Sequence, residues 1–197
     1  MNTKDKILTG AFELFKKRGF KGVTMDEIAK SLSMSKRTIY ENFDDKRELI
    51  RTIIEIEIRK STEQYEYLMK SNDNIYTILK QIDNIHKETY KNTSPLLKSD
   101  LKKYYPTIIT DVTKLFYETR SKVIRLTLMQ GIKQGLFLES TNINTISLLF
   151  ENTLDFSIKK IEEKQFSEKD MSDCCIALLR GISTRKGFEY MNSYKQE

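Results

Sequence analysis

Residues 24–49 read TMDEIAKSLSMSKRTIYENFDDKREL and contain three short helical patterns separated by two breaks. Thr24, followed three residues later by Glu27, is typical of a capping box, in which the hydroxyl accepts an orphan N–H and the carboxylate reaches back to the cap. Residues 33–35 interrupt the first pattern, and Ser35 is placed to cap the helix that follows. Two helices joined by a three-residue turn form a helix-turn-helix, and the spacing predicts one here.

The second helix of this pair, expected over residues 36–43, has a narrow apolar side and a broad polar side. Ile39 and Phe43 lie four residues apart and point towards a core. In a helix-turn-helix the second helix enters the major groove by its N-terminal end, where backbone N–H groups and donor side chains meet phosphates and bases. We therefore expect contacts to DNA from Thr24, Ser35, Lys36, Arg37, Thr38, Tyr40 and Lys46.

Within that set, the residue types suggest different roles. Lys36, Arg37 and Thr38 are expected at base edges, whereas Tyr40, Lys46 and the hydroxyl or N–H of Thr24 are expected on phosphates. The alternative is that this helix is an ordinary exposed polar helix with no partner.

Three groups of residues resemble the DNA-binding domain of TetR-family transcriptional regulators. They are Gly19-Phe20 with 23–29, then 35–40, then Phe43 with 46–49, and they include the run I/L-Y-x-x-F-x-x-K-x-x-L. The resemblance covers about residues 4–50. It implies an all-helical regulator with a shared DNA-binding head and a variable helical body that binds a small molecule.

The chain departs from the family pattern at two positions where glycine is common, Ser33 and, less strictly, Arg37. A residue other than glycine in a left-handed turn costs roughly 1–2 kcal/mol, which a folded domain tolerates. At the second position, Arg37 adds a guanidinium group whose two adjacent N–H donors can make a bidentate contact with guanine.

Composition favours helices along the whole chain. The 197 residues include 2 Pro and 7 Gly, and apolar residues recur at helical spacing in nearly every segment. We expect an all-α fold of about nine helices. Residues 1–48 form a DNA-binding domain, which we call the head, and residues 49–197 form a helical effector-binding and dimerisation domain, which we call the body.

The helix that begins at Lys46 is expected to run to about residue 69, too long for the head alone, so it would couple the head directly to the body. The last helix is expected to begin after Ser167 and to continue to Phe188 and Met191. By resemblance, the last two helices pair with their copies in a four-helix homodimer interface. The distribution of apolar residues supports this, because a helix that buries one face needs only one apolar stripe, whereas these two helices are apolar around much of their circumference. The residues concerned are Leu148, Leu149, Phe150, Leu178 and Leu179.

A two-fold dimer presents two recognition helices to successive major grooves, about one helical turn apart or somewhat more. The expected partner is therefore double-stranded DNA with a palindromic operator. The net charge of +6 suits nucleic acid, but the excess is shared between the first fifty residues and the rest, so the placement of individual cations matters more than their number.

A ligand site in the body is expected from the resemblance and from the many aromatic side chains with polar tips. The candidates are Tyr65, His86, Tyr90, Tyr105, Phe116, Tyr117 and Phe150. A pocket needs apolar walls and a few convergent polar groups, which this set could supply. For any single tyrosine, half-buried packing is favoured instead, a lone histidine is more often a satisfied core group, and the two phenylalanines are core by default.

Enzyme chemistry and membrane insertion find little support in the sequence. With one histidine there is no His-based metal cluster, and Gly-rich phosphate loops, Gly-x-Ser-x-Gly and Cys-x-x-Cys motifs are absent, so we expect no enzyme, no metal and no cofactor. Cys174 and Cys175 are adjacent, which disfavours an ordinary disulfide and fits a reducing cytoplasm, with buried packing favoured over redox sensing. No apolar run approaches the roughly 18 residues of a membrane span, and the N-terminus lacks a signal-peptide core.

The sequence therefore predicts a cytoplasmic DNA-binding transcriptional regulator, expected from the resemblance to be a repressor that a small-molecule effector releases. The first alternative is a DNA-binding regulator without such an effector. The second is a helical small-molecule carrier or enzyme with a vestigial head.

Overall fold

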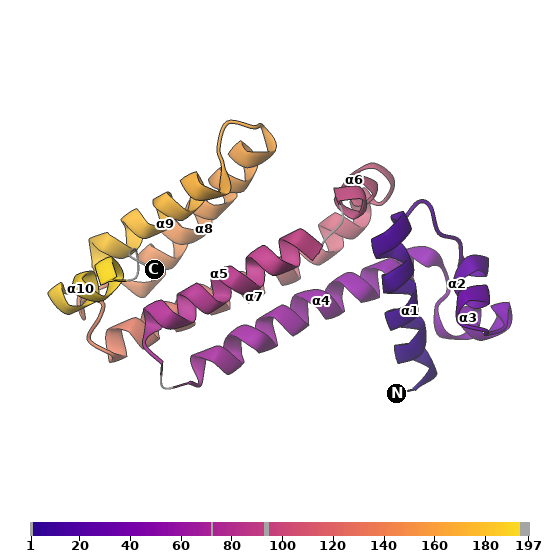
Figure 1. Cartoon of the computed structure of the whole chain (residues 1–197), viewed down its shortest axis with the longest axis horizontal. Helices are drawn as coiled ribbons and strands as arrows, with labels where there is room; N and C mark the ends of the chain where they lie inside the picture. Colours follow the sequence, from indigo (N-terminus) through magenta and orange to yellow (C-terminus); the bar gives the residue numbers. More distant parts are fainter. Residues whose placement is uncertain (1, 72, 93–94, 194–197) are drawn as a thin grey trace. The chain divides into compact units, whose positions relative to one another are not determined.

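The computed structural model describes residues 2–71, 73–92 and 95–193, with side chains described over 2–71, 73–85 and 96–192. Over these residues the chain forms ten α-helices and no strand (Figure 1), which confirms the predicted all-α class. The helices are α1 (Thr3–Arg18), α2 (Met25–Ser31), α3 (Lys36–Asn42), α4 (Lys46–Met69), α5 (Ile75–Asn92), α6 (Pro95–Tyr104), α7 (Pro106–Lys133), α8 (Ile143–Glu162), α9 (Glu168–Ile182) and α10 (Arg185–Ser193). None of them combines the length and the apolar character that crossing a bilayer requires.

The described helices number ten rather than about nine because the expected last helix is broken in two. Ser183 is extended, with φ −76° and ψ 140°, and forms an isolated antiparallel bridge with Phe137. The N–H of Thr184 donates to the carbonyl of Leu136 at 3.0 Å, and its hydroxyl accepts the N–H of Gly187 at 3.1 Å. Backbone pairing with a distant segment therefore ends α9, and a threonine cap begins α10.

The chain divides into two compact units. Unit 1 comprises Met1–Ser61 and Asn84–Tyr117, and unit 2 comprises Thr62–Asp83 and Glu118–Glu197. Three long helices, α4, α5 and α7, have residues in both units. The predicted functional boundary between residues 48 and 49 lies within α4 and stays a prediction.

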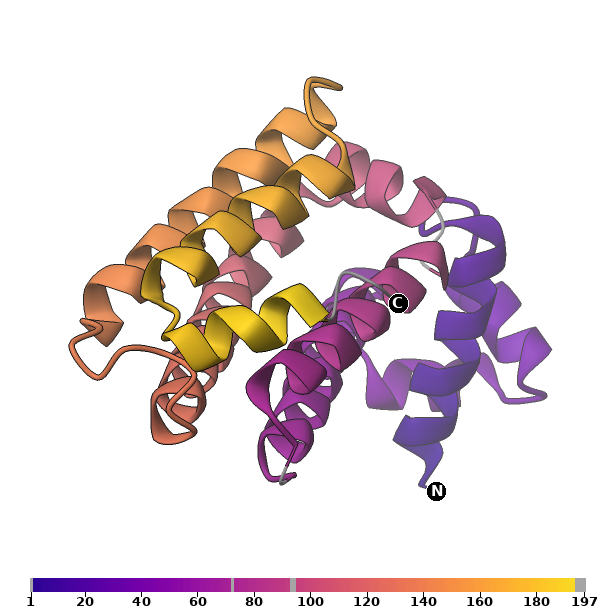
Figure 2. The same ribbon diagram turned by 60° about the vertical axis from the view of Figure 1, so that its left-hand side comes forward.

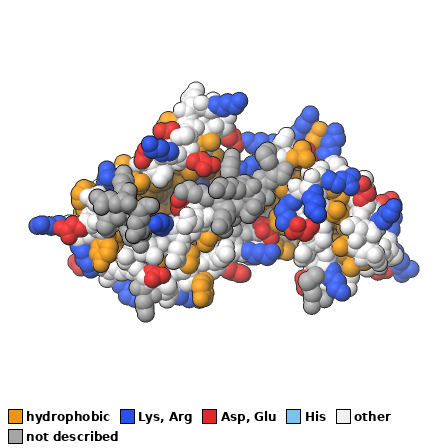
Figure 3. All heavy atoms as spheres, in the orientation of Figure 1, with side chains coloured by type: hydrophobic (Ala, Val, Ile, Leu, Met, Phe, Trp, Pro, Cys, Tyr) orange, Lys and Arg blue, Asp and Glu red, His pale blue; other side chains and the backbone are white. Residues whose placement is uncertain are grey.

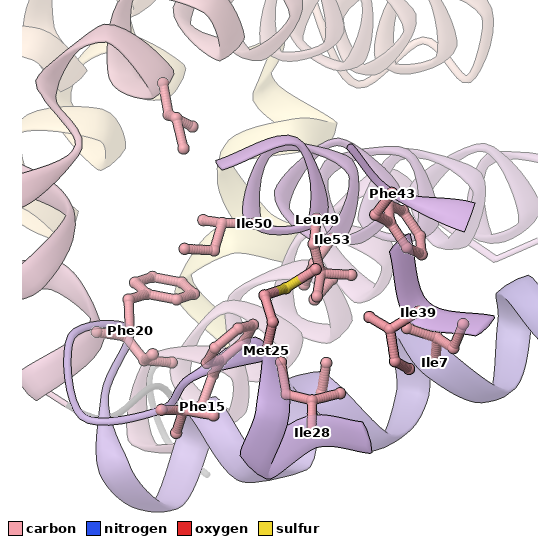
Figure 4. Close-up of a cluster of buried hydrophobic side chains, with 14 of the residues drawn as sticks. Ile7, Phe15, Phe20, Met25, Ile28, Ile39, Phe43, Leu49, Ile50 and Ile53 are labelled. Atoms are coloured by element: carbon pink, nitrogen blue, oxygen red, sulfur yellow. The ribbon is translucent and has the colours of Figure 1, made fainter. Parts of the chain in front are cut away.

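The core of unit 1 forms where the apolar stripes of α1, α2, α3 and the start of α4 converge (Figure 4). Its fully buried members include Phe15, Ile28, Ile39 and Leu49, each with no exposed side-chain surface. Fully burying one such side chain stabilises a fold by about 1.5–3 kcal/mol. This core holds α2 and α3 against α1, and buried residues of α6 and α7 belong to the same cluster.

Polar contacts also tie the head to α6 and α7 within unit 1. The Asp100 side chain, 6% exposed, accepts the backbone N–H of Lys21 at 2.8 Å. Gly19, which ends α1 at φ 73°, allows this approach, because a Cβ there would overlap Asp100 and Leu96. Arg47, at the start of α4, donates from Nη1 to the hydroxyl of Thr107 in α7 at 2.8 Å. Residues 1–48 therefore share one packed unit with segments much later in the chain.

In unit 2, α8 and α9 lie side by side, as Figures 1 and 2 both show. Phe137 is fully buried between segments distant in sequence, with the ring of Tyr76 edge-on at 6.0 Å and Gly131 of α7 too close to carry a Cβ. Large apolar side chains remain exposed along α8: Leu148 (59%), Leu149 (45%), Phe156 (52%) and Ile158 (41%). Helix α8 therefore leaves apolar surface that unit 2 itself does not cover.

Candidate nucleic-acid interface

The N-terminus of α2 is fixed by the predicted capping box. The Thr24 hydroxyl accepts the N–H of Glu27 at 3.2 Å, and the Glu27 carboxylate accepts the N–H of Thr24 at 2.8 Å. Arg18 of α1 donates to the same carboxylate at 2.7 Å and to the carbonyl of Gly22 at 2.8 Å. The Thr24 N–H and the Arg18 guanidinium together lower the pKa of Glu27 to about 2. An ionised Glu27 thus joins α1 to the start of α2.

The turn between α2 and α3 is tight and left-handed at one residue. Ser33 has φ 52°, the conformation that glycine adopts without steric cost, so the strain expected at this position is present. The N–H of Met34 donates to the carbonyl of Ala29 at 2.9 Å and closes the turn. Ser35 then caps α3, since its hydroxyl accepts the N–H of Thr38 at 3.0 Å, as predicted.

The exposed side of α3 carries two cations, and each one is paired with a carboxylate. Lys36 is within 2.8 Å of Asp26 on α2, and this hydrogen-bonded partner raises the pKa of Lys36. Arg37, with 87% of its side chain exposed, donates from Nε to Glu41 at 2.7 Å. Both cations remain exposed to solvent, so α3 offers cationic donors that could meet a polyanion.

The remaining predicted contacts differ in how accessible they are. Tyr40 is 43% exposed, with the Lys36 ammonium 5.9 Å from its ring centroid. Thr38 is half-buried, and its hydroxyl is 2.8 Å from that of Ser35. Lys46 is also half-buried, and burial lowers its pKa. Thr24 and Ser35 are exposed caps.

Charges of both signs are interspersed over the surface around α1 to α3, on the right in Figure 3. The basic character of the chain is not gathered into one broad field on the face shown.

Sequence reasoning missed the carboxylate partners of the two cations. The spacing of Arg37 and Glu41, four residues apart on one helix, is a local signal that could have found the first pair. The pairing of Lys36 with Asp26 joins different helices, and no local pattern announces it.

The predicted ligand residues are distributed over both units. Tyr65 and Phe150 are buried in unit 2, and burial raises the pKa of Tyr65 to about 12. Phe116 and Tyr117 are each 43% exposed in unit 1, with ring centroids 6.0 Å apart. The side chains of His86 and Tyr90 lie outside the described residues, and the ligand role of the whole set stays a prediction.

Tyr105, another predicted ligand residue, packs against the core of unit 1. Its ring lies edge-on to Phe20 at 6.3 Å between centroids, and the Lys46 ammonium is 6.0 Å from its centroid. Among the described side chains, no group of three His, Cys, Asp or Glu has an arrangement that could hold a metal. Both cysteines are half-buried free thiols, and burial raises the pKa of Cys175 to about 11, so its thiol is protonated at neutral pH.

Comparison with known proteins agrees with this geometry. Residues 7–53 match the bacterial regulatory proteins of the tetR family. The biofilm operon icaADBC HTH-type negative transcriptional regulator IcaR of Staphylococcus epidermidis is 34% identical over 77 residues, which are 38% of this chain and 39% of that protein. The chain thus matches about two fifths of the length of this curated relative.

Solved structures extend the similarity over most of the fold. A transcriptional regulator from Cytophaga hutchinsonii superposes with a TM-score of 0.75 at 20% identity, covering 90% of this chain and 97% of that one. FadR from Bacillus subtilis, solved in complex with stearoyl-CoA, superposes with a TM-score of 0.62 at 16% identity, covering 90% and 98%. At such identities the likeness concerns the fold.

Proposed function

We propose that the chain, whose residues 7–53 match the tetR family of bacterial regulatory proteins, is a sequence-specific DNA-binding regulator that represses transcription. The observation that carries this proposal is the capped, solvent-facing α3, which holds Arg37 with 87% of its side chain exposed. IcaR is a negative transcriptional regulator, and this supports repression as the sign of the effect. The proposal makes the chain a cytoplasmic regulator rather than an enzyme.

The proposed division of labour assigns DNA binding to residues 1–48. Lys36, Arg37 and Thr38 read base edges, because they lie on the first turn of α3. Phosphates are held by Thr24, Tyr40 and Lys46, while Ser35 fixes the start of the helix. A phosphate near Lys46 would compensate the partial burial that lowers its pKa.

Residues 49–197 are proposed to dimerise and to bind an effector. The exposed apolar side chains of α8, with Leu148 59% and Phe156 52% exposed, favour a partner surface of the same chain, since a two-fold interface covers both copies at once. Two heads related by that axis would bind a palindromic operator.

Effector control is proposed to act through α4. This helix contributes Leu49, Ile50 and Ile53 to the core of unit 1, and its last residues belong to unit 2. A ligand that binds one position of α4 more tightly than another would shift the equilibrium between two head positions by that difference in affinity. FadR was solved with stearoyl-CoA, which supports a small-molecule ligand for the body of this chain. A regulator without effector is the second candidate, since residues 1–48 alone account for the DNA contacts.

The test is a mobility-shift titration of the purified protein with DNA from its own promoter region, with excess random competitor at stated salt. Salt must be fixed because affinity falls by about 10³–10⁵ between low and moderate salt when several phosphates are contacted. A competitor-resistant complex with a two-fold footprint supports the proposal. Binding no tighter than to random DNA, at any salt, would favour a carrier with a vestigial head.

A further inference from the structure

The Arg37–Glu41 pair has a geometry that bears on base recognition. Arg37 donates through Nε to Glu41 Oε1 at 2.7 Å, and within the described residues its terminal nitrogens Nη1 and Nη2 make no hydrogen bond or ion pair. Both side chains are exposed, Arg37 by 87% and Glu41 by 57%. One edge of the guanidinium is therefore occupied, and the outer edge with two parallel N–H donors is open.

The other polar side chains of α3 are mostly engaged within the protein. The hydroxyls of Ser35 and Thr38 lie 2.8 Å apart, and the Asn42 amide donates to the carbonyl of Thr38 at 2.8 Å. Lys36 is paired with Asp26 at 2.8 Å. The outer edge of Arg37 is thus the one adjacent pair of charged donors on α3 that has no partner in the described part of the chain.

We propose that Glu41 positions Arg37 to read guanine, so that the base preference of α3 is set by the pair rather than by Arg37 alone. This inference rests on the proposed DNA-binding function. Guanine presents two adjacent acceptors, O6 and N7, in the major groove, and a bidentate contact requires the guanidinium to present one particular edge. A carboxylate on the Nε edge removes the competing side-on mode and reduces the rotamer freedom that binding would otherwise have to remove.

The carboxylate has a second, opposite effect on binding. Glu41 is an exposed negative charge on a surface that approaches phosphates, so it weakens binding to every DNA sequence alike. Discrimination between sequences is a difference of affinities, and a residue can raise that difference while lowering general affinity. If the Arg37–Glu41 pair only stabilised the helix, removing Glu41 would not weaken base discrimination while strengthening binding to random DNA.

Two substitutions separate the effect of the negative charge of Glu41 from the effect of its side-chain length. Glu41→Gln removes the negative charge, whereas Glu41→Asp keeps it on a side chain one methylene shorter, which weakens its hold on Arg37 Nε. The matched control is Glu189→Gln in α10, since Arg185 donates from Nε to Glu189 at 3.2 Å with the same spacing and similar exposure. Equilibrium titrations at one salt concentration compare the promoter site, single-base-pair variants of that site, and random DNA.

We expect Glu41→Gln to bind random DNA about two- to threefold more tightly and to lose about three- to tenfold of the preference at one base pair, the same pair that Arg37→Ala affects. Glu41→Asp should lose that preference without tighter binding to random DNA, and Glu189→Gln should match the wild type. In an Arg37→Ala background, Glu41→Gln should change no base preference, because a positioning residue acts through its partner.

Three results would overturn the inference. Unchanged preference at that base pair in both Glu41 variants would show that Arg37 needs no positioning. A loss that persists in the Arg37→Ala background would make Glu41 a direct reader of a base. A wild-type protein that prefers no sequence would refute the proposed function itself and the inference with it, and this outcome is recognised before any variant is measured. Circular dichroism of each variant excludes unfolding as the cause.

Discussion

Replacing Ser33 by glycine should stabilise the protein without altering its DNA-binding surface. Ser33 is exposed, has φ 52°, and makes no side-chain hydrogen bond within the described residues. The left-handed conformation costs a non-glycine residue roughly 1–2 kcal/mol, which the substitution recovers. Glycine gains about 0.5–1 kcal/mol of conformational freedom in the unfolded chain, which opposes folding. Taking the midpoints of these two ranges, the net expectation is a stabilisation of about 0.5–1 kcal/mol.

Thermal unfolding followed by circular dichroism, at one protein concentration, measures this effect. For a chain of this size a change of 1 kcal/mol moves Tm by about 2–4 °C, so Ser33→Gly should raise Tm by about 1–4 °C. Lys164 has φ 58° and offers a second test in unit 2, where Lys164→Gly should also raise Tm.

The control is Ser31→Gly, two residues earlier at the end of α2, where the backbone is helical and the side chain exposed. Glycine in a helix is less favourable than serine by about 0.5 kcal/mol, so this variant should lower Tm. If Ser31→Gly lowers Tm and Ser33→Gly lowers it as well, the turn stores no strain and the reasoning fails. If both variants raise Tm, the effect belongs to glycine content and not to the turn.

Four further expectations concern recognition, pH, packing and assembly. Arg37→Ala should reduce the preference at one base pair by about 1–3 kcal/mol, whereas Lys46→Ala should weaken all sequences alike; equal losses for Arg37→Ala on specific and random duplexes would exclude base reading. The pKa of Glu27 is lowered from 4.5 to about 2 in the folded state, so its stabilising contribution is complete above pH 4.5 and is lost as pH falls towards 2. The difference in Tm between the wild type and Glu27→Gln should therefore become smaller as pH falls over that range. A difference that stays constant would contradict the pairing of Glu27 with Thr24 and Arg18. Gly131→Ala should destabilise unit 2 by about 1–3 kcal/mol in urea titration, because the new methyl group would overlap the ring of Phe137, whereas Gly181→Ala, which would meet nothing, should stabilise by up to about 1 kcal/mol. Leu149→Lys should convert a dimer to monomer in sedimentation measurements, and an unchanged mass would exclude α8 from the interface.

Local patterns predicted the recognition region well because its determinants are local. The Thr24 and Ser35 caps and the turn at Ser33 are each set by residues within a few positions of one another. Capping hydrogen bonds and left-handed turns depend on short-range backbone geometry, which the order of residue types specifies directly. The predicted extents 36–43 and 46–69 followed from the same kind of signal and agree closely with α3 (Lys36–Asn42) and α4 (Lys46–Met69).

Contacts between residues far apart in sequence determined the features that local patterns did not predict. Helical periodicity alone continued the last helix through residue 183, but the bridge to Phe137 and the bond from Thr184 to Leu136 broke it into α9 and α10. The main neighbour of Tyr105, whose ligand role stays a prediction, is also distant in sequence, because Phe20 lies against its ring in the core of unit 1. Neither neighbour lies within reach of a local pattern.

The sequence by itself determined that the chain is all-helical and where α3 begins, because helical periodicity, capping residues and turns act over a few residues. Only the tertiary structure decided which distant groups meet. It joined Asp100 to the N–H of Lys21, 79 residues away in sequence, and gave Lys36 its partner Asp26 from another helix. It also placed residues 84–117 in the same unit as the head. Such contacts depend on which helix faces pack against each other in three dimensions, and the local pattern of residue types along the chain does not specify that pairing.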